Sequence, residues 1–148
     1  MTTKAYRTLL KREESYAVHA LLYVAEHPGA PAARIAEELE LPRDFLAKVL
    51  RRLGKAGLVH NLAGRTGGVR LAVDLGSLTL LDVLEAVSGP VVIDTCQTLE
   101  RCPTQKRTGA CSLNGAWLSV SRQVRESFAG VRLDTLIAPE SRPPATLG

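Results

Sequence analysis

The first half of the chain shows three stretches in which apolar residues recur at helical spacing. The first predicts a helix over residues 11–26, with its apolar stripe formed by Ala17, Ala20, Leu21 and Val24. A shorter helix is predicted over 32–39. A third runs from about 43 to 55, and its buried stripe is Leu46, Val49, Leu50 and Leu53. Gly57 is a typical residue to end this third helix.

Two short apolar runs follow, at 58–62 and 69–73, and the glycine-rich residues 64–68 separate them. Glycines supply the positive φ angles that a hairpin turn needs, so the pattern predicts a β-hairpin. Helices followed by a hairpin in this order are typical of a winged helix-turn-helix. We therefore expect a mainly α fold, with a DNA-binding domain at 1–75 that carries a two-stranded wing.

The second half predicts one more short helix, a long loop and a long helix. The run from Thr79 to Asp82 resembles a capping box that begins a helix. Residues 91–110 are expected to form a loop, and 112–129 a helix. This last helix carries apolar residues at coiled-coil-like spacing, which favours a dimer interface over packing on the chain's own core. The predicted seam is Leu113, Trp117, Val120, Val124 and Phe128.

We accordingly assign 76–138 to a cysteine loop with a C-terminal dimerisation helix, and 139–148 to a flexible tail that holds three prolines. The composition is that of an ordinary globular protein. No apolar run approaches the roughly 20 residues needed to cross a membrane, and the first residues do not resemble a secretory signal. We expect a cytoplasmic protein with no membrane partner.

Charge is distributed unevenly along the chain. Residues 1–75 hold 12 Lys and Arg against 8 Asp and Glu, whereas 76–148 hold 7 of each. Between Arg43 and Arg70 there are seven basic residues and one acid, Asp44. A basic face on a helix is often only solvated, but this one continues into the hairpin. The distribution therefore favours a polyanion as partner, namely double-stranded DNA.

A helix fits the major groove, where side chains near its start read base edges. Arg43, Asp44 and Lys48 are the predicted groove residues. Arg51 and Lys55 are expected to meet phosphates, which position the protein but do not specify sequence. At the wing, Arg65 and Thr66 are placed to reach the minor groove, and Arg70 either contacts DNA or pairs locally.

The three cysteines are Cys96, Cys102 and Cys111. An odd number in a cytosolic chain argues against a disulfide framework, and the spacing is not that of a zinc ribbon. All three lie in or beside one loop, so they can converge, and thiolates suit iron–sulfur clusters. The alternative is that they are inert thiols with no shared role.

Several stretches taken in order resemble the Rrf-two family of winged-helix transcription regulators, the IscR and NsrR type. They are Tyr16 to Leu21, Phe45 to Leu53, Gly57 to Val59, Gly64 to Ala72, Thr79 to Val87, and Leu133 to Leu136. The resemblance covers roughly residues 11–137. It implies a homodimer on a pseudo-palindromic operator, with an iron–sulfur cluster in the cysteine loop and no enzymatic activity.

Three thiolates leave such a cluster one ligand short. The resemblance implies that the missing ligand comes from the first helix of the other subunit, where Glu14, Ser15 and His19 are the candidates. With His and carboxylate ligands, a [2Fe-2S] cluster becomes possible, and it is favoured here over [4Fe-4S]. The sequence departs from the family pattern at Ala63, Val69 and His19, and the gap between Cys102 and Cys111 is wide.

The leading hypothesis is a dimeric regulator whose operator binding is controlled by this cluster, through redox state, iron or nitric oxide. The second is a clusterless regulator of the same fold that acts as a thiol switch or small-molecule sensor. The third is a small iron–sulfur electron-transfer protein or metalloenzyme, which would leave the basic helix and hairpin without a role.

Overall fold

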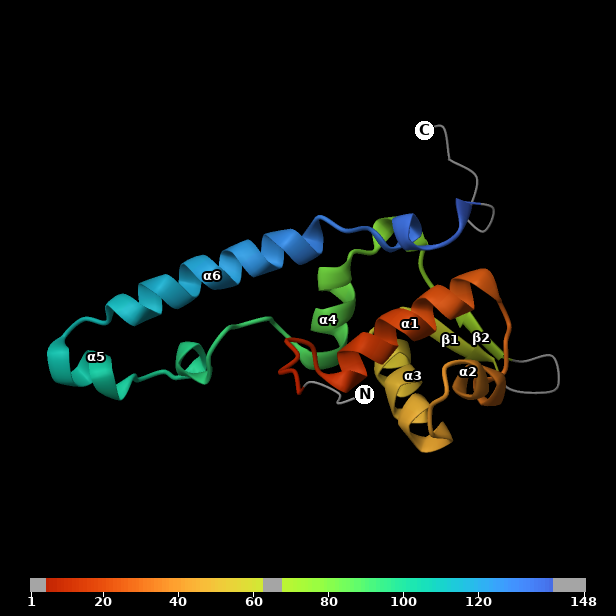
Figure 1. Cartoon of the computed structure of the whole chain (residues 1–148), viewed down its shortest axis with the longest axis horizontal. Helices are drawn as coiled ribbons and strands as arrows, with labels where there is room; N and C mark the ends of the chain where they lie inside the picture. Colours follow the sequence, from red (N-terminus) through yellow and green to blue (C-terminus); the bar gives the residue numbers. More distant parts are fainter. Residues whose placement is uncertain (1–4, 63–67, 140–148) are drawn as a thin grey trace.

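The computed structural model describes residues 5–62 and 68–139 and shows a mainly helical chain with one two-stranded antiparallel sheet (Figure 1). The predicted fold class is confirmed. The elements in order are α1 (Arg12–Glu26), α2 (Ala32–Glu38), α3 (Arg43–Lys55), β1 (Val59–Leu62), β2 (Gly68–Leu71), α4 (Leu80–Ser88), α5 (Pro103–Thr108) and α6 (Ser112–Ala129), with 3-10 turns η1 (Leu75–Ser77), η2 (Thr95–Thr98) and η3 (Leu133–Leu136).

The core forms where α1 packs against α3 and α4. The predicted apolar stripes of α1 and α3 are both buried, which confirms the helical periodicity. Ala17 and Ala20 on α1 are fully buried and small, so neighbouring elements can approach the helix closely. Burial of one stripe fixes the rotation of α3 and leaves its polar residues on the outside.

The end of α3 is set by Gly57, as predicted. Gly57 has a φ of 80°, in the left-handed region that side chains disfavour. Its N–H donates to the carbonyl of Gly54 at 3.0 Å, and the N–H of Leu58 donates to the carbonyl of Leu53 at 2.9 Å. These two bonds satisfy carbonyls at the helix end and turn the chain into β1.

The wing is joined to the loop between α1 and α2. The N–H of Val69 donates to the carbonyl of Ala30, and the N–H of Gly29 donates to the carbonyl of Val69, each at 2.9 Å. Within the hairpin, Val59 pairs with Leu71 and Leu62 with Gly68. The wing therefore keeps a fixed position relative to α1 and α2 at its base. The predicted contacts Arg65 and Thr66 lie outside the described residues.

The end of the chain returns to this core. Thr79 and Asp82 form the predicted capping box at the start of α4, with bonds of 2.9 and 3.2 Å. Just ahead of it, the N–H of Leu133 donates to the carbonyl of Leu78 at 3.0 Å, and Leu133 is fully buried. Apart from Pro139, the predicted tail lies outside the described residues.

The α6 helix projects away from the bundle that α1 to α4 form, and α5 lies at its far end (Figure 1). Its bounds are those predicted, Ser112–Ala129. The expectation of a loop over 91–110 was wrong, because the segment contains η2 and α5. Asp94 caps η2, because its side chain accepts the N–H of Cys96. The α5 helix begins at Pro103, and Gly109, whose φ is 77°, directly follows its last residue.

We expect Gly68→Ala to destabilise the protein much more than Gly57→Ala. A Cβ at Gly68 would lie 2.0 Å from the carbonyl oxygen of Gly29, and the φ of Gly68 is 144°. At Gly57 the φ is also positive but a Cβ meets nothing within 4 Å. The Gly57 variant should lose about 1–2 kcal/mol for left-handed strain alone, and the Gly68 variant more than about 3 kcal/mol. Thermal unfolding by circular dichroism measures both, and equal losses would contradict the close approach of wing and loop.

Candidate functional site

The outward face of α3 carries most of the residues predicted to contact DNA. They are all exposed: Arg43, Asp44, Lys48, Arg51 and Lys55. The opposite face is the buried stripe, so the core holds this surface toward solvent. A basic face on a helix that projects from a compact bundle can enter a groove of the duplex.

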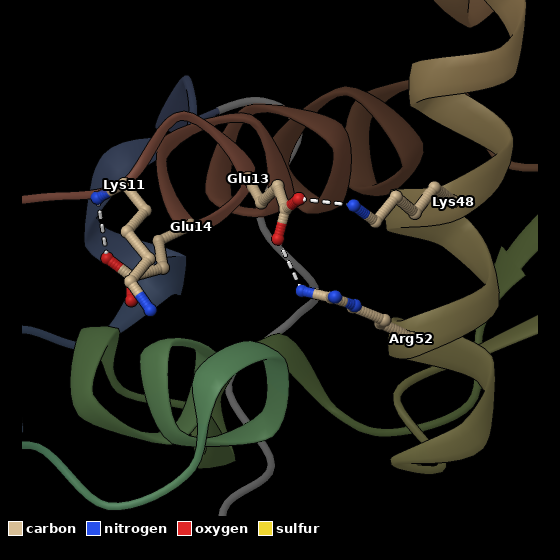
Figure 2. Close-up of polar contacts among 5 residues, drawn as sticks. All are labelled: Lys11, Glu13, Glu14, Lys48 and Arg52. Atoms are coloured by element: carbon tan, nitrogen blue, oxygen red, sulfur yellow. Dashed lines mark hydrogen bonds and ion pairs between the residues drawn. The ribbon is translucent and has the colours of Figure 1, made fainter.

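An acidic residue of α1 reaches this basic surface, as Figure 2 shows. One oxygen of Glu13 accepts a hydrogen bond from Lys48 Nζ at 2.6 Å, and the other pairs with the guanidinium of Arg52. The bond from Lys48, together with the charge of Arg52, lowers the pKa of Glu13 below its usual value. Lys48, a predicted groove residue, is therefore already engaged by a carboxylate.

Sequence reasoning missed the role of Glu13 because a charge count, whether over residues 1–75 or over 43–70, does not show which acid pairs with which base. The ion pairs join residues 35 and 39 positions apart, so nothing local in the sequence reveals them. The only signal was a pair of acids in the first turn of α1, which also suits the helix dipole.

At the wing, Arg70 is exposed and its guanidinium lies against the backbone of Gly29. The side chain therefore covers the α1–α2 loop at the base of the hairpin. This position is compatible with a phosphate contact and also with a local structural role, the two alternatives that the sequence left open.

Each cysteine lies at or near the start of a helical element. Cys96 lies in η2, Cys102 directly precedes α5, and Cys111 directly precedes α6. All three are half-buried free thiols. A thiol at a helix N-terminus is close to unpaired backbone N–H groups, which favour its thiolate.

The three thiols influence one another, which shows that the fold brings them into one neighbourhood. The pKa of Cys96 is raised, first by burial, then by Asp94 and, more weakly, by Cys102 and Cys111. The pKa of Cys102 is lowered by the backbone N–H groups of Gln105 and Thr104, with a smaller contribution from Cys111. Among the described residues, however, no three His, Cys, Asp or Glu side chains are arranged to hold a metal ion. The thiols thus affect one another's pKa values, but among the described residues of one chain they do not form a closed ligand set.

The predicted α1 ligands do not join the cysteines in the same chain. Glu14 accepts the N–H of Lys11 at 2.8 Å, and the His19 ring lies 5.8 Å from that of Tyr16. Figure 1 places α1 in the bundle and α5 at the far end of α6. Glu14, Ser15 and His19 therefore remain a prediction that concerns a second subunit.

The turn that carries Cys96 is tied to α6 by the next residue, Gln97. Its Oε1 accepts the N–H groups of Ile93 and Asp94 at 2.8 and 3.1 Å, and its Nε2 donates to Ser121 Oγ at 3.2 Å. Ser121 is 7% exposed and is the one buried residue of α6. Nearer the end of α6, Arg125 forms an ion pair with Glu85 of α4.

The predicted dimer seam is incompletely covered within one chain. Leu113 and Val120 are 54% and 39% exposed, and Leu118 is also exposed. Trp117, Val124 and Phe128 are half-buried, and the last two line a hollow of about 420 Å³ beside the start of α1. No helix in the described part of the chain is long and apolar enough to span a membrane.

Comparison with known proteins identifies the class. The sequence profile of the Rrf2 family, described as an iron-dependent transcriptional regulator, matches residues 10–139. The regulator IscR of Xenorhabdus nematophila is 31% identical over 125 residues, covering 82% of this chain and 74% of that protein. Protein aau3 of Rhizobium meliloti is 32% identical over 133 residues, covering 86% and 84%. The chain therefore belongs to the Rrf2 family.

Solved structures show the same fold at lower identity. IscR of T. potens has a TM-score of 0.68 at 22% identity, and the match covers 87% of this chain and 85% of the IscR chain. CymR, the global cysteine regulator of B. subtilis, has a TM-score of 0.67 at 22% identity and covers 88% and 96%. The chain is a DNA-binding transcriptional regulator and not an enzyme, which removes the electron-transfer and metalloenzyme alternative.

We expect the three thiols of the metal-free protein to react at different rates with iodoacetamide. The thiolate is the nucleophile, so a lowered pKa raises its population at neutral pH and a raised pKa reduces it. Cys102 should therefore be alkylated faster than Cys96 at neutral pH, and as the pH is raised its rate should increase over a lower pH range than that of Cys96. Mass spectrometry of peptides after timed quenching measures this, and the difference should disappear in denaturant. Equal or faster labelling of Cys96 in the folded protein would contradict the assignment.

Proposed function

We propose that this Rrf2 regulator acts as a homodimer on a pseudo-palindromic operator, and that an iron–sulfur cluster held by Cys96, Cys102 and Cys111 controls its DNA binding. The observation that carries the proposal is the gathering of three half-buried free thiols between η2 and the first turn of α6. The match to an iron-dependent regulator family supports it.

The donor set fits such a group. Thiolates are the usual ligands of iron–sulfur clusters, and Cys102 is poised as a thiolate by the N–H groups at the start of α5. Cys111 directly precedes α6. A further ligand from α1 of the second subunit, with His19, Glu14 and Ser15 as candidates, completes the set and keeps [2Fe-2S] favoured over [4Fe-4S].

When bound, the cluster supplies sensitivity to redox state, iron supply or nitric oxide. The protein's own contribution is a rigid link from the thiols to the DNA-binding bundle. Gln97 fastens the Cys96 turn to Ser121 of α6, and Arg125 fastens α6 to Glu85 of α4. Because α4 packs on α1 and α3, a change in how the thiols are held reaches the helix that faces DNA.

Dimerisation rests on the exposed part of α6. Leu113, Leu118 and Val120 lie outside the core of one chain. The indole N–H of Trp117 is buried and has no hydrogen-bond acceptor among the described residues. A second α6 helix would cover this surface, and two α3 helices would then read half-sites about one helical turn, or 10 bp, apart.

In this arrangement α3 enters the major groove. Arg43 and Asp44, in its first turn, are placed for base edges, whereas Arg51 and Lys55 are placed for phosphates. Arg65, Thr66 and Arg70 of the wing are the candidates for contacts outside that groove.

One observation favours a second candidate, a thiol switch without a cluster. The pKa of Cys102 is lowered, with Cys111 among the causes, which makes these two thiols the candidate pair for a disulfide. Each thiol would lose one proton and one electron to an oxidant such as a peroxide, which is reduced to water or alcohol. One structural neighbour is CymR of Staphylococcus aureus in its oxidised form, at 23% identity and a TM-score of 0.63.

The leading proposal predicts a coloured protein after purification without oxygen. Thiolate–iron charge transfer should give visible absorbance, with iron and sulfide present in stoichiometric amounts. Cys96→Ala should lose the colour and change operator affinity relative to the loaded protein. A colourless, metal-free protein that still binds a palindromic site would contradict the cluster proposal and favour the thiol switch.

We further expect Ser121→Ala to weaken the link between the cysteines and DNA without removing the cluster. The variant loses one neutral hydrogen bond to Gln97, which should cost about 1 kcal/mol of unfolding free energy. The ratio of operator affinities between the loaded and metal-free forms should fall by about fivefold. Fluorescence anisotropy on both forms measures it.

Ser127→Ala provides the matched control, since Ser127 is an exposed residue of the same helix. It should leave the affinity ratio at the wild-type value. An unchanged ratio in Ser121→Ala, with cluster content intact, would exclude the Gln97–Ser121 bond as the link.

A further inference from the structure

Glu13 of α1 forms ion pairs with two residues of α3, the helix proposed to bind DNA. One carboxylate pairs with two cations that lie one helical turn apart on α3, Lys48 and Arg52 (Figure 2). The Glu13 side chain is only 23% exposed, whereas both cations are more open to solvent. Figure 2 also shows that the neighbouring Glu14 turns instead to Lys11 on its own helix.

The position of the two cations on α3 explains why α1 reaches them. Lys48 and Arg52 lie beside Phe45 along the flank of the helix that faces α1, and the Phe45 ring packs edge-on against Tyr16 at 5.9 Å. Arg43, Arg51 and Lys55 have no ion pair among the residues that the structure describes. The basic surface of α3 is thus divided into a paired flank and an unpaired outer face.

We propose that Glu13 is a specificity-determining residue, which holds Lys48 and Arg52 back from DNA phosphates and so leaves sequence reading to the outer face of α3. The proposal rests on α3 being the DNA-binding helix and is independent of the cysteines. It also revises the role of Lys48 from a groove contact to a partner of Glu13.

The physical argument is a balance of charge. Binding to any DNA sequence comes mainly from neutralised phosphates, whereas discrimination comes from contacts to bases. With Glu13 ionised, the three side chains together carry one positive charge instead of two. Even if DNA breaks the pairs, which are weak at a surface, an unpaired carboxylate then lies close to the phosphates and repels them. Glu13 therefore lowers binding to all sequences more than it lowers binding to the preferred one.

The test compares Glu13→Gln with Glu26→Gln, which makes the same charge change at the exposed opposite end of α1. The probes are a duplex that the wild-type chain enriches from a random-sequence pool and a scrambled duplex of the same composition. Affinities for both are measured by fluorescence anisotropy over a series of potassium chloride concentrations.

We expect Glu13→Gln to bind the scrambled duplex about three- to tenfold more tightly at low salt, and to make the slope of log affinity against log salt steeper by about 1–2. The ratio of selected to scrambled affinity should fall by a similar factor. Adding Lys48→Gln to the Glu13→Gln variant should reverse part of the gain. Glu26→Gln should keep the wild-type ratio, because its distance from the α3 flank leaves it screened.

A purely structural tie between α1 and α3 gives a different result, since its loss lowers the unfolding temperature without changing the salt slope. An unchanged slope and ratio in a folded Glu13→Gln variant, or weaker binding to both duplexes, would overturn the proposal. If Glu13→Gln does not fold, Glu13→Ala, which removes the same negative charge, should still steepen the slope, and an unchanged slope would refute the proposal. Wild-type protein that enriches no sequence from the pool would overturn the DNA-binding role of α3 itself, a result distinct from failure of the Glu13 variant alone.

Discussion

The packing of α3 on α1 is the constraint on which the rest of the structure depends. Leu46, Val49, Leu50 and Leu53 of α3 are almost fully buried, and so are the small residues Ala17 and Ala20 of α1, the helix on which α3 packs. Removing four such side chains from water contributes about 1.5–3 kcal/mol each, which fixes the rotation of α3 about its axis. That rotation decides which residues face solvent and which flank Glu13 can reach. The basic outer face and the paired flank are thus two consequences of one buried stripe.

Much of the fold follows from the sequence because its signals are local. The bounds of α6, the stripes of α1 and α3, the capping box of Thr79 and the stop at Gly57 each depend on residues a few positions apart. The short helices η2 and α5 were missed although Asp94, Pro103 and Gly109 were visible as a cap, a first-turn proline and a terminating glycine. The two elements are only four and six residues long, too short for helical periodicity to be visible in the sequence.

The candidate site was harder to predict because its contacts are not local. Glu13 meets Lys48 and Arg52 across 35 and 39 residues, and Gln97 meets Ser121 across 24. No periodicity or charge count within a window reveals such pairs. The sequence identifies the cysteines, but it does not reveal that the pKa values of Cys96 and Cys102 shift in opposite directions. Burial and Asp94 raise the pKa of Cys96, while two backbone N–H groups lower that of Cys102.

The opposite pKa shifts of Cys96 and Cys102 bear on how the segment that carries the cysteines would work. A thiol with a lowered pKa is ready to act as a ligand or nucleophile, and one with a raised pKa releases its proton only when something stabilises the thiolate. Under the cluster proposal, Cys96 would therefore change its protonation state more than Cys102 on binding a metal, and Cys96 is adjacent to Gln97, which bonds to Ser121 of α6.

The cluster proposal and the Glu13 proposal both involve residues of α1. In the proposed arrangement, residues 14, 15 and 19 of this helix face the cysteines of the second subunit. Residue 13 pairs instead with α3 of its own subunit. Successive residues on a helix point about 100° apart, so one helix can serve both directions at once.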